Sequence, residues 1–106
     1  MKILAVDQSY TCSGIVVLSD GELHFAETFT TDKEKDAFDR AWEITEHIRA
    51  IALNCKPEVI ALEGLAFGMR GNATRDLAGL QFTIINALRH LDGFKTLVIS
   101  PKTVKK

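Results

Sequence analysis

The first third of this 106-residue chain contains three short runs of apolar and β-branched residues separated by polar positions. These runs predict strands at residues 1–7, 13–18 and 22–30, because such residues fit the pleated, half-buried surface of a sheet. Asp20-Gly21 separates the last two runs, and this dipeptide is typical of a two-residue hairpin turn. The pattern therefore predicts a meander of three consecutive strands.

Helical periodicity begins after the meander. Residues 36–55 and 74–90 predict two amphipathic helices, and each is followed by a short apolar run, 59–63 and 96–99, that predicts a strand. Pro57 prevents the first helix from continuing. We expect the periodic side chains of the first helix to face the core: Phe38, Ala41, Trp42, Thr45, Ile48, Ile51 and Cys55. The corresponding stripe of the second helix is Leu77, Leu80, Gln81, Ile84 and Leu88.

The order of these elements, βββαβαβ, predicts an α/β protein with a mixed five-stranded sheet and flanking helices. Right-handed crossovers place the fourth strand beside the first, which gives the strand order 3-2-1-4-5 of a ribonuclease H-like fold. The length fits a single domain over residues 1–106.

Composition narrows the classes of protein. The chain is 46% apolar and 25% charged, which is ordinary for a globular protein and excludes a disordered chain. No apolar run approaches the roughly 18 residues that span a membrane. Asp7 interrupts any secretory apolar region, and Cys12 and Cys55 have no metal-ligand spacing. We therefore expect a cytoplasmic protein with reduced thiols and no membrane partner.

Two carboxylates end buried strands. Asp7 follows the apolar run ILAV, and Glu63 follows VIAL. A carboxylate flanked by apolar residues is costly unless it is paired, hydrogen-bonded or bound to a metal ion. If their strands are parallel neighbours, Asp7 and Glu63 lie at one edge of the sheet, where two carboxylates suit Mg²⁺, with Mn²⁺ as a substitute. The alternatives are a strand-end cap for Asp7 and an ion-paired strand terminus for Glu63.

The formal net charge of −1 conceals a division of charge along the chain. Residues 1–69 carry 6 basic and 12 acidic side chains, whereas residues 70–106 carry 7 basic and 2 acidic ones. This basic second part, together with an aromatic residue in a glycine-rich loop, favours a nucleic-acid partner. The candidate nucleic-acid contacts are Ser9, Thr11, Phe67, Arg70, Arg75, Lys102, Lys105 and Lys106. Ordinary solvation of the charges, a simple bend at residues 8–11 and a core position for Phe67 are the alternatives.

Three segments together resemble the RuvC-type Holliday junction resolvases: ILAVDQSYTCSGIVVL, VIALEGLAFGMRGNATRDLAGLQFTI and VISPKTVKK. The resemblance covers nearly the whole chain in order and spacing. It implies a homodimeric, Mg²⁺-dependent endodeoxyribonuclease of a bacterium or a phage-infected cell, which resolves four-way or branched DNA junctions. In this resemblance Asp7 and Glu63 match the first two catalytic carboxylates, and Phe67 lies in the loop that places an aromatic residue at the junction. The lysines of PKTVKK match a basic segment.

The sequence differs from these resolvases in one respect. Resolvases of this kind carry two further carboxylates on a C-terminal helix that this chain does not contain. Asp76 and Asp92 follow Glu63, but neither is placed to replace them. The expectation is therefore a domain incomplete at its C-terminus, with little or no cleavage activity of its own and an apolar strip left exposed on one face of the sheet.

Three other functions remain open at this stage. The chain could be a module that binds branched DNA without cleaving it, or a ribonuclease H-like nuclease for another nucleic acid. The segment after Asp7, QSYTCSG, also resembles the first phosphate loop of actin-like sugar kinases. Those kinases need a second lobe that 106 residues cannot supply, so no nucleotide cofactor is expected.

Overall fold

The structure is a computed structural model that describes residues 1–63, 72–91, 93 and 95–99. Five strands and two helices follow one another in the predicted sequence, with bounds that differ from the predicted ones by two residues at most. In chain order they are β1 (Lys2–Asp7), β2 (Cys12–Ser19), β3 (Glu22–Thr30), α1 (Ala37–Cys55), β4 (Val59–Glu63), α2 (Asn72–Arg89) and β5 (Lys95–Ile99).

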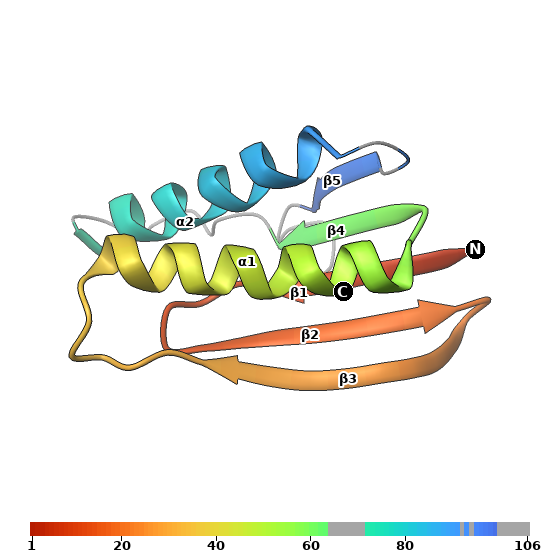
Figure 1. Cartoon of the computed structure of the whole chain (residues 1–106), viewed down its shortest axis with the longest axis horizontal. Coiled ribbons are helices and arrows are strands. Elements are labelled where there is room, and N and C mark those ends of the chain that lie inside the picture. The colour runs from red at the N-terminus through yellow and green to blue at the C-terminus, as the bar shows by residue number, and fades with distance from the viewer. Residues whose placement is uncertain (64–71, 92, 94, 100–106) are drawn as a thin grey trace.

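The five strands form one sheet in the order β3-β2-β1-β4-β5, which confirms the predicted topology (Figure 1). Strand β1 is central: it pairs antiparallel with β2 and parallel with β4. In the β1–β2 register Asp7 lies opposite Gly14, and in the β1–β4 register Val6 is the partner of Leu62. This register brings the carboxyl ends of β1 and β4 side by side.

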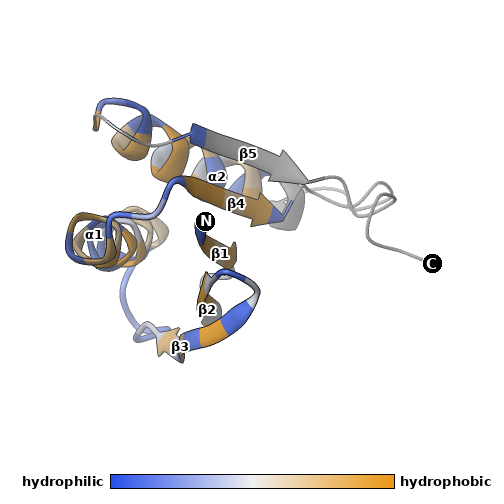
Figure 2. Ribbon diagram, turned by 90° about the vertical axis from the view of Figure 1, so that its right-hand side faces the viewer, coloured by the Kyte–Doolittle hydropathy of each residue, from blue (hydrophilic) through white to orange (hydrophobic). Residues whose placement is uncertain are grey.

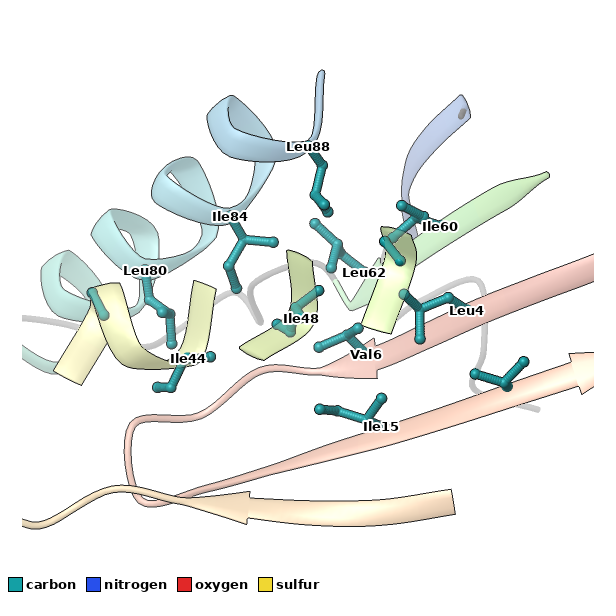
Figure 3. Close-up of a cluster of buried hydrophobic side chains, with 13 residues drawn as sticks. Leu4, Val6, Ile15, Ile44, Ile48, Ile60, Leu62, Leu80, Ile84 and Leu88 are labelled. Atoms are coloured by element: carbon teal, nitrogen blue, oxygen red, sulfur yellow. The ribbon is translucent and has the colours of Figure 1, made fainter. Parts of the chain in front are cut away.

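Both helices cover the same face of the sheet, and the opposite face carries no described element (Figure 2). Because side chains alternate along a strand, every second residue of the central strands enters the core beneath the helices. Figure 3 shows these side chains interdigitating with those of the two helices. The strands contribute Leu4, Val6, Ile15, Val17, Ile60 and Leu62, and the helices contribute Ala41, Ile44, Ile48, Ala52, Leu80, Ile84 and Leu88.

Capping residues define both ends of helix α1. The Asp36 side chain accepts a hydrogen bond of 2.8 Å from the backbone N–H of Asp39, which satisfies a donor of the first turn. At the other end Lys56 takes the left-handed conformation, and its N–H donates to the carbonyl of Ala52. Pro57 follows, fully buried, and directs the chain into β4.

The prediction that Trp42 faces the core is wrong. The Trp42 side chain is 59% exposed, whereas Ile44, absent from the predicted stripe, is fully buried. One residue turns a helix by about 100°, so the buried stripe through Ala41 and Ile44 leaves Trp42 at its outer side. Phe38 is 86% exposed, because the first turn of α1 projects past the ends of β1 and β4 (Figure 1).

A contact between His47 and Glu27 joins the edge strand β3 to α1. The Nε2 atom of His47 lies 3.0 Å from Oε2 of Glu27, and its ring stacks on Phe29 with centroids 4.1 Å apart. The two residues are 20 positions apart, on consecutive elements that face each other only in the folded chain, so no local spacing predicts the pair.

Neither helix of the described chain is apolar enough over its length to cross a membrane.

Candidate metal and nucleic-acid site

Asp7 and Glu63 come together at the carboxyl edge of the central strands. Each is the last residue of its strand, immediately after the paired residues Val6 and Leu62. Those two residues face the helices and are buried, so alternation directs Asp7 and Glu63 to the uncovered face. Both carboxylates are exposed there.

An open cleft of about 380 Å³ lies on this uncovered face and ends at the two carboxylates. Gly14 stands opposite Asp7 in the neighbouring strand, and a Cβ atom added there would lie 3.8 Å from Cβ of Asp7. The missing side chain keeps the β2 side of Asp7 open. The described lining of the cleft is Ala5, Val6, Asp7, Gly14, Val16, Ala61, Leu62 and Glu63. Of the apolar lining residues on this face, Ala5 and Val16 are half-buried and Ala61 is buried, so the strip that the sequence predicts to be exposed is only partly accessible.

The two carboxyl groups interact directly. A hydrogen bond to Asp7 raises the pKa of the Glu63 carboxyl above its ordinary value, because it favours the protonated form. The negative charge of Asp7 raises this pKa further, and partial burial adds to the effect. Without a cation, the fully ionised pair is therefore electrostatically unfavourable.

This donor set fits a hard divalent cation. Carboxylate oxygens are the ligands that Mg²⁺ prefers, and a protein commonly supplies one or two of them while water and phosphate complete the coordination. A cation would also relieve the repulsion between Asp7 and Glu63. Among the residues that the structure describes, no group of three or more His, Cys, Asp or Glu side chains could hold a metal ion. Asp7 and Glu63 would thus act as a pair of ligands rather than as part of a closed cage.

Two glutamines hold the backbone behind Glu63. Gln8 of the first loop and Gln81 of α2 each donate a hydrogen bond of 2.8 Å from Nε2 to the carbonyl oxygen of Glu63. Neither glutamine belongs to the site predicted from the sequence. A signal was present, since Gln8 follows Asp7 at an inward-facing position and Gln81 interrupts the apolar stripe of its helix.

The hydroxyl groups near Asp7 stabilise their own turn. Ser13 donates to the carbonyl of Ser9 at 2.7 Å and accepts from the Ser9 N–H at 3.0 Å. The Ser9 hydroxyl in turn accepts a hydrogen bond of 3.3 Å from the N–H of Thr11. Of the two predicted contacts, Ser9 is half-buried and Thr11 is exposed. Neither is part of the described lining of the cleft.

Tyr10 connects this loop to both helices. Its hydroxyl donates a hydrogen bond of 2.7 Å to the carbonyl of Asp76 in α2. Its own carbonyl accepts from Nη2 of Arg40 at 3.1 Å and from the hydroxyl of Thr31, and the Arg40 guanidinium lies 5.7 Å from the centre of the Tyr10 ring. Burial raises the pKa of the Tyr10 hydroxyl, which stays protonated and available as a donor.

Arg75 is exposed and lies in a different place from the carboxylates. It lines a cleft of about 280 Å³ with Tyr10 and Phe38, between the N-terminal parts of the helices. The structure therefore does not bring Arg75 into the cleft of Asp7 and Glu63. The other predicted nucleic-acid contacts lie outside the described residues: Phe67, Arg70, Lys102, Lys105 and Lys106.

The fold of this chain is similar to those of solved Holliday junction resolvases. No protein-family model matches the sequence, and no curated protein matches it. Among solved structures, RuvC of Thermus thermophilus in complex with a Holliday junction substrate superposes with a TM-score of 0.86 at 19% identity, over 99% of this chain and 68% of the RuvC chain. The fowlpox virus resolvase, solved with Holliday junction DNA, gives a TM-score of 0.64 at 17% identity, over 100% of this chain and 64% of the other.

A third structure, the yeast mitochondrial Holliday junction resolvase Ydc2, matches with a TM-score of 0.59 at 16% identity, over 95% of this chain and 53% of its own. These likenesses establish that the chain has the ribonuclease H-like fold of RuvC-type resolvases. The chain spans about two thirds of the length of the RuvC and poxviral proteins.

Proposed function

We propose that this chain is the nuclease domain of a structure-specific DNA endonuclease that resolves four-way or branched junctions by Mg²⁺-dependent phosphodiester hydrolysis. The observation that carries the proposal is the pair Asp7 and Glu63, side by side at an open cleft. Its support is the fold, which is shared with a RuvC solved on a junction substrate.

The residues of the chain have distinct roles in this proposal. Asp7 and Glu63 would hold Mg²⁺ or Mn²⁺ through their carboxylate oxygens. Such a cation, when bound, activates a water molecule and stabilises the leaving oxygen in phosphodiester cleavage. Gly14 leaves room beside Asp7 for the approaching phosphate. The hydrogen bonds around Ser9 and Tyr10 fix the loop that leaves Asp7.

DNA contacts would extend from this cleft over the neighbouring surface. Ser9 and Thr11 would contact phosphate near Asp7, and Arg75 would contact a more distant part of the backbone. Phe67 would stack on a base, and the remaining cations would pair with phosphates: Arg70, Lys102, Lys105 and Lys106.

We also propose that full activity needs carboxylates beyond Asp7 and Glu63. Two carboxylates suffice for one Mg²⁺, whereas phosphodiester cleavage commonly uses a pair of divalent cations. The uncovered face of the sheet leaves space for a further segment beside Asp7 and Glu63. The 106-residue chain is therefore expected to bind junction DNA but to cleave it little or not at all.

The test is binding and cleavage of a labelled four-way junction in Mg²⁺ or Mn²⁺, with linear duplex and an RNA–DNA hybrid as comparison substrates. We expect tighter binding to the junction than to the duplex, weakened by salt because phosphate contacts release counterions. Any cleavage should disappear in Asp7→Asn while binding persists. Equal binding to duplex and junction contradicts the proposal, and preferential cleavage of the hybrid indicates a nuclease for another substrate.

The proposal includes a homodimer through the outer face of the helices. Phe82 of α2 is 63% exposed, and a Cβ atom on Gly79, one turn away, would meet nothing within 4 Å. Trp42 of α1 lines an open groove with Thr83 and Ala87 of α2. Exposed aromatic side chains and small residues on the helices allow a partner helix to approach closely.

We expect Phe82→Glu to weaken dimerisation at least tenfold, because truncating or charging a central aromatic contact removes much of the binding energy. Sedimentation equilibrium over a range of protein concentrations measures this change. Leu23→Glu, at an equally exposed position on the edge strand β3, is the matched control and should not alter the dimer. A wild-type chain that stays monomeric at millimolar concentration excludes this interface.

A further inference from the structure

Two buried amide side chains converge on one backbone atom at the candidate site. Gln8 and Gln81 are only 7% and 6% exposed, and both donate from Nε2 to the carbonyl oxygen of Glu63 at 2.8 Å. Gln8 immediately follows Asp7 in the chain. Gln81 belongs to α2, one of the two helices that cover the sheet. A single carbonyl thus connects the two carboxylate-bearing strands with the helix that covers them.

These bonds replace strand pairing where that pairing ends. The β1–β4 register stops at Val6 and Leu62, one residue before the carboxylates. A carbonyl oxygen has two acceptor sites, and the amides of Gln8 and Gln81 match that number. Beyond Val6 and Leu62, the hydrogen bond from the Gln8 side chain to the Glu63 carbonyl therefore sets the separation of the ends of β1 and β4.

Gln8 makes this bond at a cost to the fold. Among the residues that the structure describes, its buried Oε1 atom has no hydrogen-bond donor. A buried polar atom without a partner destabilises a protein. An apolar side chain of the same length at position 8 would therefore give a more stable fold than glutamine. Buried polar groups that remain half satisfied are expected where a function requires them.

We propose that Gln8 and Gln81 are positioning residues that set the separation of the Asp7 and Glu63 carboxylates for a divalent cation. The inference rests on the proposed function, because it concerns the same pair of carboxylates. It predicts an unusual combination for Gln8: the amide lowers the stability of the fold and increases the affinity of the site for its cation.

The experiment compares Gln8→Met with the wild type in two measurements on the 106-residue chain. Calorimetric titration with Mn²⁺ measures cation affinity, and thermal unfolding in EDTA measures stability. Methionine preserves length and apolar packing but removes both the donor to Glu63 and the unpaired Oε1. We expect Mn²⁺ to bind Gln8→Met about tenfold more weakly or worse, the usual effect of losing a group that orients a ligand, with an unchanged or raised melting temperature. Gln81→Met should weaken Mn²⁺ binding in the same direction.

Thr45→Val is the matched control. Thr45 is fully buried in α1, and its Oγ1 likewise has no partner among the described residues. Removing this hydroxyl should raise the melting temperature and leave Mn²⁺ affinity unchanged, because Thr45 does not contact Glu63. Wild-type binding that is retained in both glutamine variants overturns the inference alone. A wild-type chain that binds Mn²⁺ no better than Asp7→Asn overturns the proposed function and, with it, this inference.

Discussion

Asp7→Asn is expected to stabilise the metal-free protein and to remove its stabilisation by Mg²⁺ or Mn²⁺. In the wild type, Asp7 and Glu63 repel each other when both are ionised, and asparagine removes one of the two charges. A ligand at about 100 times its dissociation constant stabilises the native state by about 2.7 kcal/mol. The wild type should gain this amount from the cation, whereas Asp7→Asn should gain almost none. The ranking of the two proteins therefore reverses when a saturating cation is added.

The effect of pH on the metal-free protein has a definite sign. The pKa of Glu63 is raised in the folded state, so the folded chain holds its proton more tightly than the unfolded chain does. Stability from this group is fully present below the ordinary glutamate pKa and is lost as the pH rises through the raised value. The advantage of Asp7→Asn over the wild type should therefore be present at neutral pH and vanish in acid.

Thermal unfolding at several pH values, in EDTA and in saturating Mn²⁺, measures both effects. In EDTA at neutral pH we expect the variant to melt a few degrees above the wild type, about the effect of one partly exposed charge pair. Glu22→Gln, which removes an exposed carboxylate at the opposite end of the sheet, is the control and should change neither quantity. A variant that gains as much from Mn²⁺ as the wild type would exclude Asp7 as a ligand.

Ile44→Ala is expected to destabilise the fold by roughly 2–5 kcal/mol, the usual cost of truncating a fully buried aliphatic side chain. Ile44 is completely buried between α1 and the sheet, in the cluster that also contains Val6 and Leu80. Trp42→Ala, two positions earlier, removes a larger side chain but should cost about 1 kcal/mol or less, because surface substitutions rarely exceed that.

Urea unfolding followed by circular dichroism at 222 nm compares the two variants directly. We expect the loss of Ile44 to cost more stability than the loss of the larger Trp42 side chain. This order holds only if α1 is rotated about its axis so that Ile44 faces the sheet and Trp42 faces away. If Trp42→Ala is the more destabilising substitution, the helix is rotated and Trp42 faces the core. Trp42 fluorescence of the monomer, measured at a protein concentration below that of dimerisation, gives a second measurement, since an exposed indole emits at longer wavelength and is quenched by iodide.

The topology could be predicted from the sequence because its signals are local and strong. The hairpin dipeptide Asp20-Gly21, Pro57 after a periodic segment, and the alternation of helices with short apolar runs leave few ways to arrange five strands. The buried face of α1 was less well determined. Aromatic residues at helical spacing fit the stripe as well as Ile44 does, and only the extent of the sheet beneath the helix decides between them.

The same distinction applies to the candidate site. Asp7 and Glu63 could be found because each ends an apolar run, and the crossover rule places their strands together. Gln8 and Gln81 are 73 positions apart in the sequence, and nothing local shows that both donate to the Glu63 carbonyl. The position of Arg75 could not be predicted from its charge. Arg75 lies in the helix layer and lines a cleft to which Asp7 and Glu63 do not contribute.

Because both helices lie on one face of the sheet, its two faces tolerate substitution differently. Leu4 and Ile60 on the covered face are fixed by close packing, and almost any change there disturbs the core. Ala5 and Val16 on the other face are half-buried and line the open cleft. Substitutions around the two carboxylates should therefore cost less stability than substitutions on the covered face, so the rim of the cleft can change in sequence while the fold is retained.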